Sequence, residues 1–334
     1  MRFMENMPVP ELSIILPVFN EAETVHGLIG RLDALLPTLA FSVEVVFVND
    51  GSRDDTEVTL LAAIAGKPGM RLISLSRNFG HQMAVSCGMA EARGSAVAVL
   101  DADLQDPPEL ISEMHEKWRS GSDVVIARRR SRKGESWFKL FTAKCFYRGL
   151  ARMTDVPIEL DAGDFYLLDR QVVEVLNRCP EHSRFLRGLV AWAGFRRAVV
   201  LYDRQPRRFG RSNYTLGKMW RLAKDALFGF STTPIAFIHI LSVASLSVAL
   251  AVVIVALVTH FAGLGVPGWA TLVVLVALFG GLVLLSIGIV AEYVYRIFLE
   301  TQGRPIYVIR RDADRQAAVR EVTAGGRTSR SAPR

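Results

Sequence analysis

Residues 96–106 read AVAVLDADLQD, an uninterrupted apolar run that ends in acidic residues. A short run of this kind, without alternating polar positions, is typical of a strand buried on both faces of a parallel sheet. In such sheets ligands bind beyond the carboxyl ends of the strands. Asp101 and Asp103 follow the run directly. The stretch therefore predicts a central strand with an acidic site at its carboxyl end.

Similar short runs, rich in β-branched residues, recur before residue 210 and alternate with segments of helical length. The predicted strands are 12–16, 43–48, 72–75, 96–100 and 124–127, and the predicted helices are 21–36, 55–65, 82–92 and 108–120. Regular alternation of strand and helix predicts an α/β fold with a mainly parallel, Rossmann-like sheet. Residues 1–210 are expected to form this domain.

The composition excludes several classes of protein. The chain has 334 residues, of which 50% are apolar and 22% charged, with a formal net charge of +7, so disordered and fibrous classes do not fit. Its three cysteines have no paired spacing, which argues against a disulfide framework or a zinc ribbon. Residues 1–11 contain no apolar segment, so we expect no cleavable signal peptide.

A different composition begins after residue 225. Residues 226–291 contain no Asp, Glu, Lys or Arg, and two apolar runs, about 235–258 and 270–291, are each long enough to cross a bilayer. Residues 232–299 are therefore expected to form a domain of two transmembrane helices. Gly and Pro in residues 260–269 predict a turn between them. Arginines and lysines flank the pair but not the turn, so the positive-inside rule places both ends in the cytoplasm. A hairpin buried inside a soluble protein is the alternative.

Two segments beside this hairpin mix aromatic and basic residues, as helices at a membrane surface do. Residues 136–153 are equally compatible with packing on the core of the first domain. Residues 211–231 run directly into the apolar region, which favours the membrane surface. Residues 300–334 are expected to form a cytoplasmic tail whose end is disordered.

Three of the predicted strands end in polar residues that a parallel sheet brings to one edge. They are followed by residues 17–21, 49–52 and 101–106. Carboxylates gathered there are costly to bury without a cation, and their hard oxygen atoms suit Mg²⁺ or Mn²⁺, which also binds phosphate oxygens. An Asp-x-Asp in a solvated loop is the alternative, but the position of Asp101 and Asp103 directly after a buried run favours a metal site.

No GxxxxGK[ST] motif occurs, and the GxGxxG match at residues 263–268 lies in the membrane turn rather than between a strand and a helix. The phosphates of a nucleotide would then be neutralised by the metal and by arginines. A basic cluster after the fifth strand offers candidates: Arg128, Arg129, Arg130, Arg132 and Lys133. A solvated basic surface is the alternative reading.

Five segments in this order resemble glycosyltransferase family 2: LSIILPVFNEAETV at 12–25, VEVVFVNDGSRDDT at 43–56, LSRNFGHQMAVSCGMAEARG at 75–94, AVLDADLQDPPELI at 98–111 and DAGDFYLLDR at 161–170. The resemblance covers nearly the whole chain. Within the family, the chain resembles the polyprenyl-phosphate branch in particular, which includes bactoprenol glucosyltransferases and dolichol-phosphate mannose synthases. EYVYRIFLETQGRPIYVI at 292–309 resembles the bactoprenol type.

The resemblance implies a GT-A fold at the cell inner (plasma) membrane, with the catalytic domain and both termini in the cytoplasm. It implies inverting transfer of a hexose, first of all glucose from UDP-glucose, to undecaprenyl or another polyprenyl phosphate. The product, a polyprenyl-monophosphate sugar, would serve cell-envelope glycosylation. The expected partners are a nucleotide sugar, the lipid phosphate and the membrane, without nucleic acid, and a homo-oligomer is possible.

Residue roles are carried over from the family motif and are implied by the resemblance alone. They are Pro17, Asn20, Glu21, Asp50 and Arg128 for the donor nucleotide; Asp101 and Asp103 for the metal; Asp103, Gln105 and Asp164 for catalysis, with Asp164 at the position of the base; and Arg130, Arg207 and Arg211 for the acceptor phosphate.

Two residues depart from the family pattern. His81 stands where a lysine is common after RNFG, and Asn213 stands in SNY where SKY is usual. Each replacement is expected to remove a cation from a region that handles phosphate.

Other functions stay open at this point. The donor is alternatively GDP-mannose or a sugar nucleotide of aminoarabinose or N-acetylhexosamine. A processive polysaccharide synthase is disfavoured, because no QxxRW motif occurs and two membrane helices leave little material for a polymer channel. A catalytically silent membrane protein that binds a partner or carries lipid is a further alternative, against which the intact set of aspartates argues.

Overall fold

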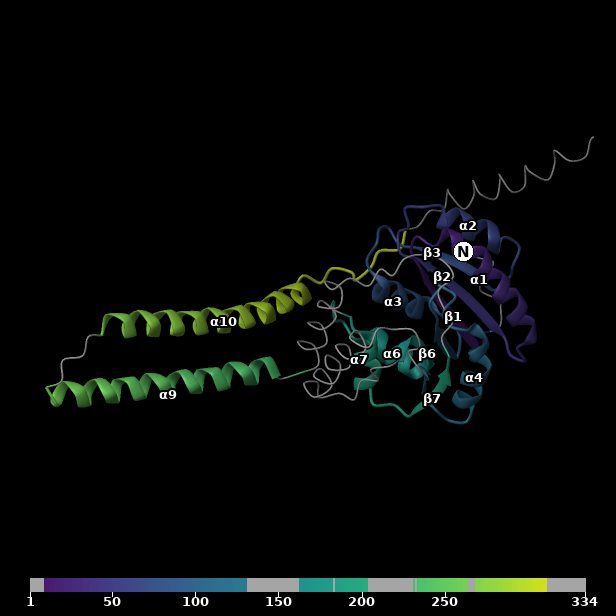
Figure 1. Cartoon of the computed structure of the whole chain (residues 1–334). Helices are drawn as coiled ribbons and strands as arrows, with labels where there is room; N and C mark the ends of the chain where they lie inside the picture. Colours follow the sequence, from purple (N-terminus) through teal and green to yellow (C-terminus); the bar gives the residue numbers. More distant parts are fainter. Residues whose placement is uncertain are drawn as a thin grey trace, which may run out of the picture.

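A computed structural model describes residues 9–130, 162–182, 184–203, 231, 233–263 and 268–310. The first part of the chain forms a seven-stranded sheet with the order β3-β2-β1-β4-β6-β5-β7 (Figure 1). The strands are β1 (Leu12–Val18), β2 (Val43–Asn49), β3 (Met70–Ser74), β4 (Ala96–Val99), β5 (Val124–Arg129), β6 (Ala162–Asp169) and β7 (Arg197–Tyr202). Only β6 pairs antiparallel with its neighbours, so the predicted mainly parallel α/β fold is confirmed.

Helices cover both faces of the sheet. One face carries α1 (Ala22–Leu35), α2 (Thr56–Ile64) and α4 (Ile111–Arg119), and the other carries α3 (His81–Glu91), α6 (Arg170–Arg178) and α7 (Leu186–Trp192). Short 3₁₀ turns, η1 (Leu36–Thr38) and η2 (Pro108–Leu110), adjoin α1 and α4. Because strand side chains alternate, Ile14 packs under the first group and Ile15 under the second. The sheet is therefore buried on both faces, as its continuous apolar runs predict.

The five predicted strands are all present, with bounds that shift by one or two residues. The shift matters at β5, which continues to Arg129. Arg128 and Arg129 thus lie within the strand, and the expectation that they follow it is wrong. The sequence analysis did not predict β6, β7, α6 or α7, although β6 carries Asp164.

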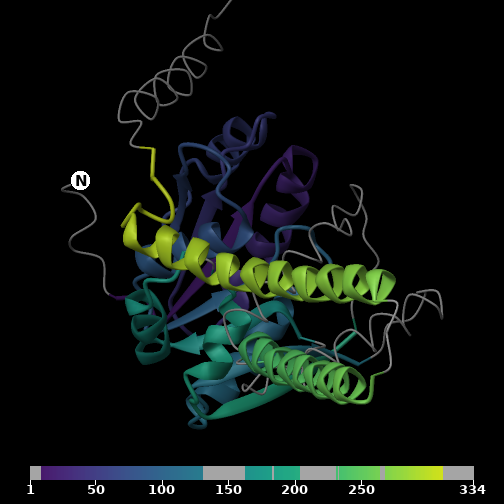
Figure 2. The same cartoon turned by 90° about the vertical axis from the view of Figure 1, so that its left-hand side faces the viewer.

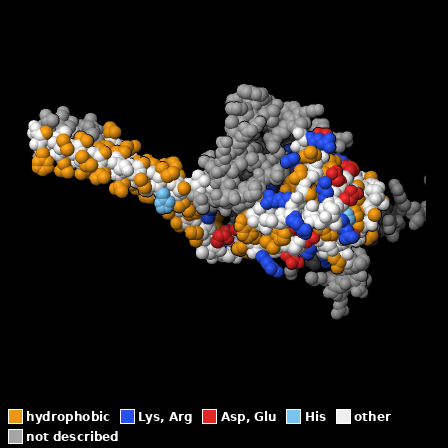
Figure 3. Space-filling view, turned by 90° about the horizontal axis from the view of Figure 1, so that it is seen from below, with side chains coloured by type: hydrophobic (Ala, Val, Ile, Leu, Met, Phe, Trp, Pro, Cys, Tyr) orange, Lys and Arg blue, Asp and Glu red, His pale blue; other side chains and the backbone are white. Residues whose placement is uncertain are grey.

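A helical hairpin stands away from the sheet (Figure 1) and extends toward the viewer in Figure 2. It consists of α9 (Thr233–Phe261) and α10 (Trp269–Thr301), which contact each other. Thr233–Thr259 and Val274–Thr301 are long and apolar enough to cross a membrane, and none of their most apolar part is buried in the described residues. Apolar side chains cover the hairpin, whereas charged ones lie over the sheet domain (Figure 3). This exposure fits a membrane environment and not a core hairpin of a soluble protein.

The second helix extends beyond the predicted end at about residue 291. Its last turns mix apolar and charged residues and include an ion pair between Arg296 and Glu292 at 3.3 Å. Glu300 then reaches the α6–α7 connection, where its carboxylate accepts from the backbone N–H of His182 at 2.8 Å and contacts Nδ1 of the same ring at 3.0 Å. The apolar hairpin is thus tied to the sheet domain through the end of α10.

Residues 303–310, here called the C-terminal strap, continue from α10 to the edge strand β3. Leu75 forms an antiparallel bridge with Ile309, Ser76 donates to the Val308 carbonyl at 2.9 Å, and Arg310 donates to Ser74 at 2.8 Å. The Arg310 guanidinium also pairs with Glu57. The strap therefore satisfies backbone groups at an edge that would otherwise be open to pairing with other chains.

Replacing Arg310 with Ala is expected to loosen the strap. The loss of a charged hydrogen bond costs about 1.5 kcal/mol, which corresponds to roughly tenfold faster opening of the strap. Hydrogen exchange of the peptide containing Ser76 measures this. Arg119→Ala is the control, because Arg119 is 67% exposed and lies 3.8 Å from Glu11. Equal exchange in the two variants would show that the ion pair does not hold the strap.

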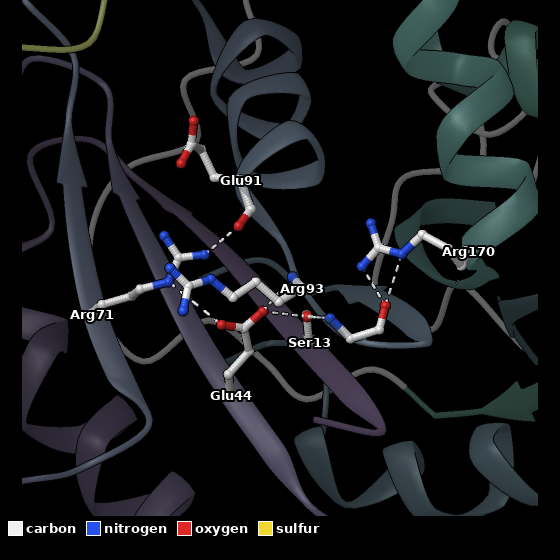
Figure 4. A network of polar contacts seen from close by, with 7 residues as sticks. Ser13, Glu44, Arg71, Glu91, Arg93 and Arg170 are labelled. Atoms are coloured by element: carbon white, nitrogen blue, oxygen red, sulfur yellow. Dashed lines mark hydrogen bonds and ion pairs between the residues drawn. The ribbon is translucent and has the colours of Figure 1, made fainter. Parts of the chain in front are cut away.

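At the amino end of β4 a buried polar network holds the strand in register (Figure 4). The Glu44 carboxylate accepts from the Ser13 hydroxyl and from the Arg93 backbone N–H, both at 2.6 Å. Gly94 donates to Ser13 at 2.7 Å, and Arg170 donates to the Gly94 carbonyl. These bonds fix the turn that leads into β4, whose opposite end carries the acidic residues.

Candidate active site

The loops after β1 and β2 lock together at the carboxyl edge of the sheet. The Asn20 side chain accepts from the Arg53 N–H at 2.9 Å, and its backbone N–H donates to the Ser52 hydroxyl at 3.0 Å. The Glu21 N–H donates to Thr56 Oγ1 at 2.8 Å. Pro17 lies buried in β1 just before these loops. The structure thus brings Pro17, Asn20 and Glu21 to one edge, while their contact with a nucleotide stays a prediction.

Asp50 is buried at the end of β2, with 3% of its surface exposed. Its two carboxylate oxygens accept from the backbone N–H groups of Phe79 at 2.7 Å and Gly80 at 2.9 Å. Burial raises the pKa of Asp50, and these two bonds and the charges of His81 and Arg77 oppose the rise. Asp50 therefore fixes the residues that begin α3 and so places His81 at the edge. Its predicted nucleoside contact stays a prediction.

His81 lies between two carboxylates that are far apart in the sequence. Its Nε2 is 3.7 Å from Asp101 Oδ1, beyond β4, and 3.4 Å from Asp164 Oδ2, on β6. Burial alone would lower the pKa of His81, but the hydrogen bond to Asp164 and the charge of Asp101 raise it to about 9. The two carboxylates therefore favour the protonated form of the His81 ring. Whether His81 removes a cation from this region stays a prediction.

Asp101 lies in a crowded acidic environment. Burial raises the pKa of Asp101 to about 6; His81 opposes the rise, and Asp164, Asp106 and Asp103 add to it. The side chain is 30% exposed, so it is accessible from the edge of the sheet. Neighbouring carboxylates disfavour each other's ionisation, and a bound cation stabilises their ionised forms.

Asp164 is more enclosed, with its side chain 13% exposed. Oδ1 lies 2.9 Å from Arg187 Nε, and Oδ2 accepts from Gln82 Nε2 at 3.2 Å. Burial alone would raise the pKa of Asp164, but the charges of Arg187 and His81 hold it well below its usual range. These two cations favour the ionised form of Asp164, which makes it a weaker base than an ordinary carboxylate.

The acidic loop after β4 is hydrogen-bonded to β7, the last strand in the order of the sheet. Asp103 Oδ1 accepts from the Gln105 backbone N–H at 3.1 Å, and Leu104 adopts a left-handed φ of 61°. Asp106, 1% exposed, accepts from the Tyr202 hydroxyl at the end of β7. Strained backbone of this kind is common at functional sites. The hydrogen bond between Asp106 and Tyr202 therefore holds the loop that places Asp103 and Gln105 at the edge beside Asp101.

The predicted phosphate-binding arginines are only partly described. Arg128 is half-buried on β5, and Arg130 is exposed, with its backbone N–H bonded to the Tyr202 carbonyl at 2.9 Å. Arg207, Arg211 and Asn213 lie outside the described residues, as do Arg132, Lys133 and the predicted interface segments. Their roles therefore stay predictions.

The donor set fits a hard divalent cation shared with a substrate. Within the described ranges no group of three or more His, Cys, Asp or Glu side chains is arranged to hold a metal ion. Asp101 and Asp103 contribute carboxylate oxygens only. Mg²⁺ and Mn²⁺ suit such a set, because Mg²⁺ in particular binds through one or two carboxylates and takes its other oxygen ligands from phosphate and water.

The sequence analysis missed two residues that contact Asp164, namely Gln82 and Arg187. A weak signal existed for Arg187, which is the only charged residue in the otherwise apolar stretch FLRGLVAW at 185–192. A charge in such a stretch needs a buried partner. Nothing local distinguishes Gln82 from other polar residues at a helix start.

Comparison with known proteins places these features in a family. The sequence profile of glycosyl transferase family 2 matches residues 13–176. An uncharacterized glycosyltransferase of Synechocystis sp. is 44% identical over 301 residues, which cover 90% of this chain and 94% of that protein. The chain belongs to glycosyl transferase family 2.

Two further relatives match over similar lengths. An uncharacterized glycosyltransferase of Bacillus subtilis is 42% identical over 90% of this chain and 94% of its own length. The bactoprenol glucosyl transferase of Shigella phage SfX is 37% identical over 90% of this chain and 99% of its own length. Because such matches include the hairpin, the relationship is not limited to the sheet domain. The chain is thus a family 2 glycosyltransferase.

Proposed function

We propose that the protein transfers glucose from UDP-glucose, with inversion, to a polyprenyl phosphate such as undecaprenyl phosphate. The observation that carries the proposal is the cluster of Asp101, Asp164 and His81 at the sheet edge of a chain that also bears an exposed apolar hairpin. The name of the phage relative, bactoprenol glucosyl transferase, supports the same donor sugar and lipid carrier. The proposal gives both parts of the chain a task in one reaction.

The donor site is proposed at the carboxyl edge, where the β1 and β2 loops meet the acidic loop. Mg²⁺ or Mn²⁺, held by Asp101 and Asp103, would neutralise the diphosphate and the charge that develops on it as the sugar leaves. Pro17, Asn20, Glu21 and Arg128 are proposed to contact the nucleotide. Gln105 is proposed to lie beside the sugar.

The acceptor determines how much base strength is needed. A phosphate monoester has a second pKa of about 6, so most of it is a dianion at cytosolic pH. A phosphate oxygen of the dianion can attack the anomeric carbon of the sugar directly and displace the nucleoside diphosphate, with inversion. Most acceptor molecules then carry no proton that a base would have to remove. The depressed pKa of Asp164 suits this chemistry, because the carboxylate is then an orienting group and not a strong base. Arg130, Arg207 and Arg211 are proposed to hold the acceptor phosphate.

The hairpin is proposed to cross the membrane twice, at about 235–258 and 270–291, with the catalytic domain of residues 1–210 and both termini in the cytoplasm. Basic residues on both sides of the apolar region support this orientation. Segments 136–153 and 211–231 are proposed to lie at the membrane surface, and 300–334 to form the tail. Assembly into a homo-oligomer stays a prediction.

Turnover with defined substrates tests the proposal. Full-length protein in detergent is given radiolabelled UDP-glucose, undecaprenyl phosphate and Mn²⁺ or Mg²⁺, and the product is partitioned between organic solvent and water. We expect label in the organic phase that depends on both the lipid and the metal. Label that stays polymeric in water would favour a processive synthase. Turnover with another nucleotide sugar would correct the donor, and no turnover with any donor would refute the proposal.

A further inference from the structure

Gln82 occupies a central position between three elements of the site. It is the second residue of α3, and its Nε2 donates to Asp164 Oδ2 on β6 at 3.2 Å. Its Oε1 accepts from the backbone N–H of Leu186, the first residue of α7, at 3.0 Å. Because a backbone N–H is only a donor, it fixes which end of the amide faces α7 and leaves the NH₂ group for the carboxylate.

The bond to α7 has a second effect on the same carboxylate. Leu186 is followed directly by Arg187, whose Nε lies 2.9 Å from Asp164 Oδ1. Gln82 therefore contacts one oxygen of Asp164 itself and helps to place the group that contacts the other oxygen. The contacts of both carboxylate oxygens therefore depend on this one amide.

We propose that Gln82 is a positioning residue that holds the Asp164 carboxylate in the orientation needed by the acceptor. The inference rests on the proposed function. Without the amide, Arg187 and His81 are the partners of the carboxylate that remain among the described residues, and the carboxylate can rotate toward these two cations. A displacement of about 1 Å at a reacting centre lowers turnover by up to about a hundredfold.

A purely structural role, joining α3 to α7, is the competing explanation. The chain contains a matched pair that separates the two. Gln171 Nε2 donates to Asp123 Oδ1 at 3.0 Å, and Asp123 also pairs with Arg196 at 3.1 Å. This second set has the same three residue types but lies at the amino end of β5, at the opposite edge of the sheet.

The first experiment compares Gln82→Met with Gln171→Met in the full-length protein. We expect Gln82→Met to lower kcat about tenfold, with less than a twofold change in KM for the donor, because the interaction is used after substrate is bound. Gln171→Met should leave kcat unchanged. Melting temperatures of both variants show whether folding is affected equally. Equal kcat values in the two variants would overturn the inference.

The second experiment removes Asp164 first. In the Asp164→Ala background we expect Gln82→Met to change kcat less than twofold, because the group that it positions is gone. A tenfold loss that persists there would show that Gln82 acts by another route and would overturn the inference. If the wild type turns over no nucleotide sugar, the proposed function is refuted, and so is the inference that rests on it. An active wild type with an unaffected Gln82→Met variant refutes only the inference.

Discussion

Asp101→Ala is expected to lower kcat by about 10³-fold or more, whereas Asp164→Asn lowers it by about 10²-fold. The difference follows from the acceptor. A phosphate dianion needs little help from a base, so the larger part of the barrier is the charge that develops on the leaving diphosphate. Asp101 is one of the two carboxylates that would hold the neutralising cation, and its loss removes that help. Asp164 keeps its shape as Asn and loses only charge and orientation.

Rates with UDP-glucose and undecaprenyl phosphate measure the two effects, together with melting temperatures to verify folding. Chelation with EDTA should abolish wild-type turnover and added Mn²⁺ should restore it, whereas excess Mn²⁺ should not restore Asp101→Ala. Glu109→Gln is the control for a nearby acidic residue, because Glu109 is 57% exposed and pairs with Arg31 at 2.8 Å. A folded Asp164→Asn variant that is slower than Asp101→Ala would contradict the proposed division of roles.

Gly51→Ala is expected to destabilise the protein by about 3 kcal/mol or more. Gly51 follows Asp50 with a left-handed φ of 65°, and a Cβ there would lie 2.3 Å from the backbone carbonyl carbon of Arg77. Backbone cannot move aside as a flexible side chain can. The β2 loop must then separate from residues 77–78, which pulls the Asp50 carboxylate away from the Phe79 and Gly80 amides.

Gly66→Ala is the matched control. Gly66 has a similar φ of 76°, but nothing lies within 4 Å of the added Cβ. This variant bears only the cost of the left-handed conformation, about 1 kcal/mol. Denaturant titration followed by fluorescence compares the two free energies of unfolding, and turnover shows the damage to the site, which we expect in Gly51→Ala alone. Equal destabilisation would mean that the close approach of the two loops does not matter.

The parallel part of the sheet was predictable because its strands are short, mostly apolar runs that contain β-branched residues and alternate with segments of helical length. The order of those strands then brings Asp101 near the loops after β1 and β2. The hairpin was also predictable, since two long apolar runs separated by Gly and Pro need no tertiary information. The extension of α10 from about residue 291 to Thr301 was missed, because the charged residues Glu292, Arg296 and Glu300 interrupt the apolar run there.

The antiparallel strand β6 was not predictable from its pattern alone. Its place between β4 and β5 depends on pairing with residues far away in the chain, and no local rule specifies such a partner. The same holds for His81. Its place in the sequence motif suggested a lost cation, and only the fold shows that two carboxylates, from β6 and from the end of β4, lie beside its ring.

The sequence by itself determined which strands are buried, where the acidic residues end a strand and which helices are apolar enough for a membrane, because these properties depend on neighbours in the chain. Only the tertiary structure decided that Gln82, Arg187 and His81 surround Asp164, and that Asp50 holds the start of α3. Hydrogen bonds and ion pairs between distant segments depend on distances of a few ångströms. Such distances exist only after the sheet and its helices have packed.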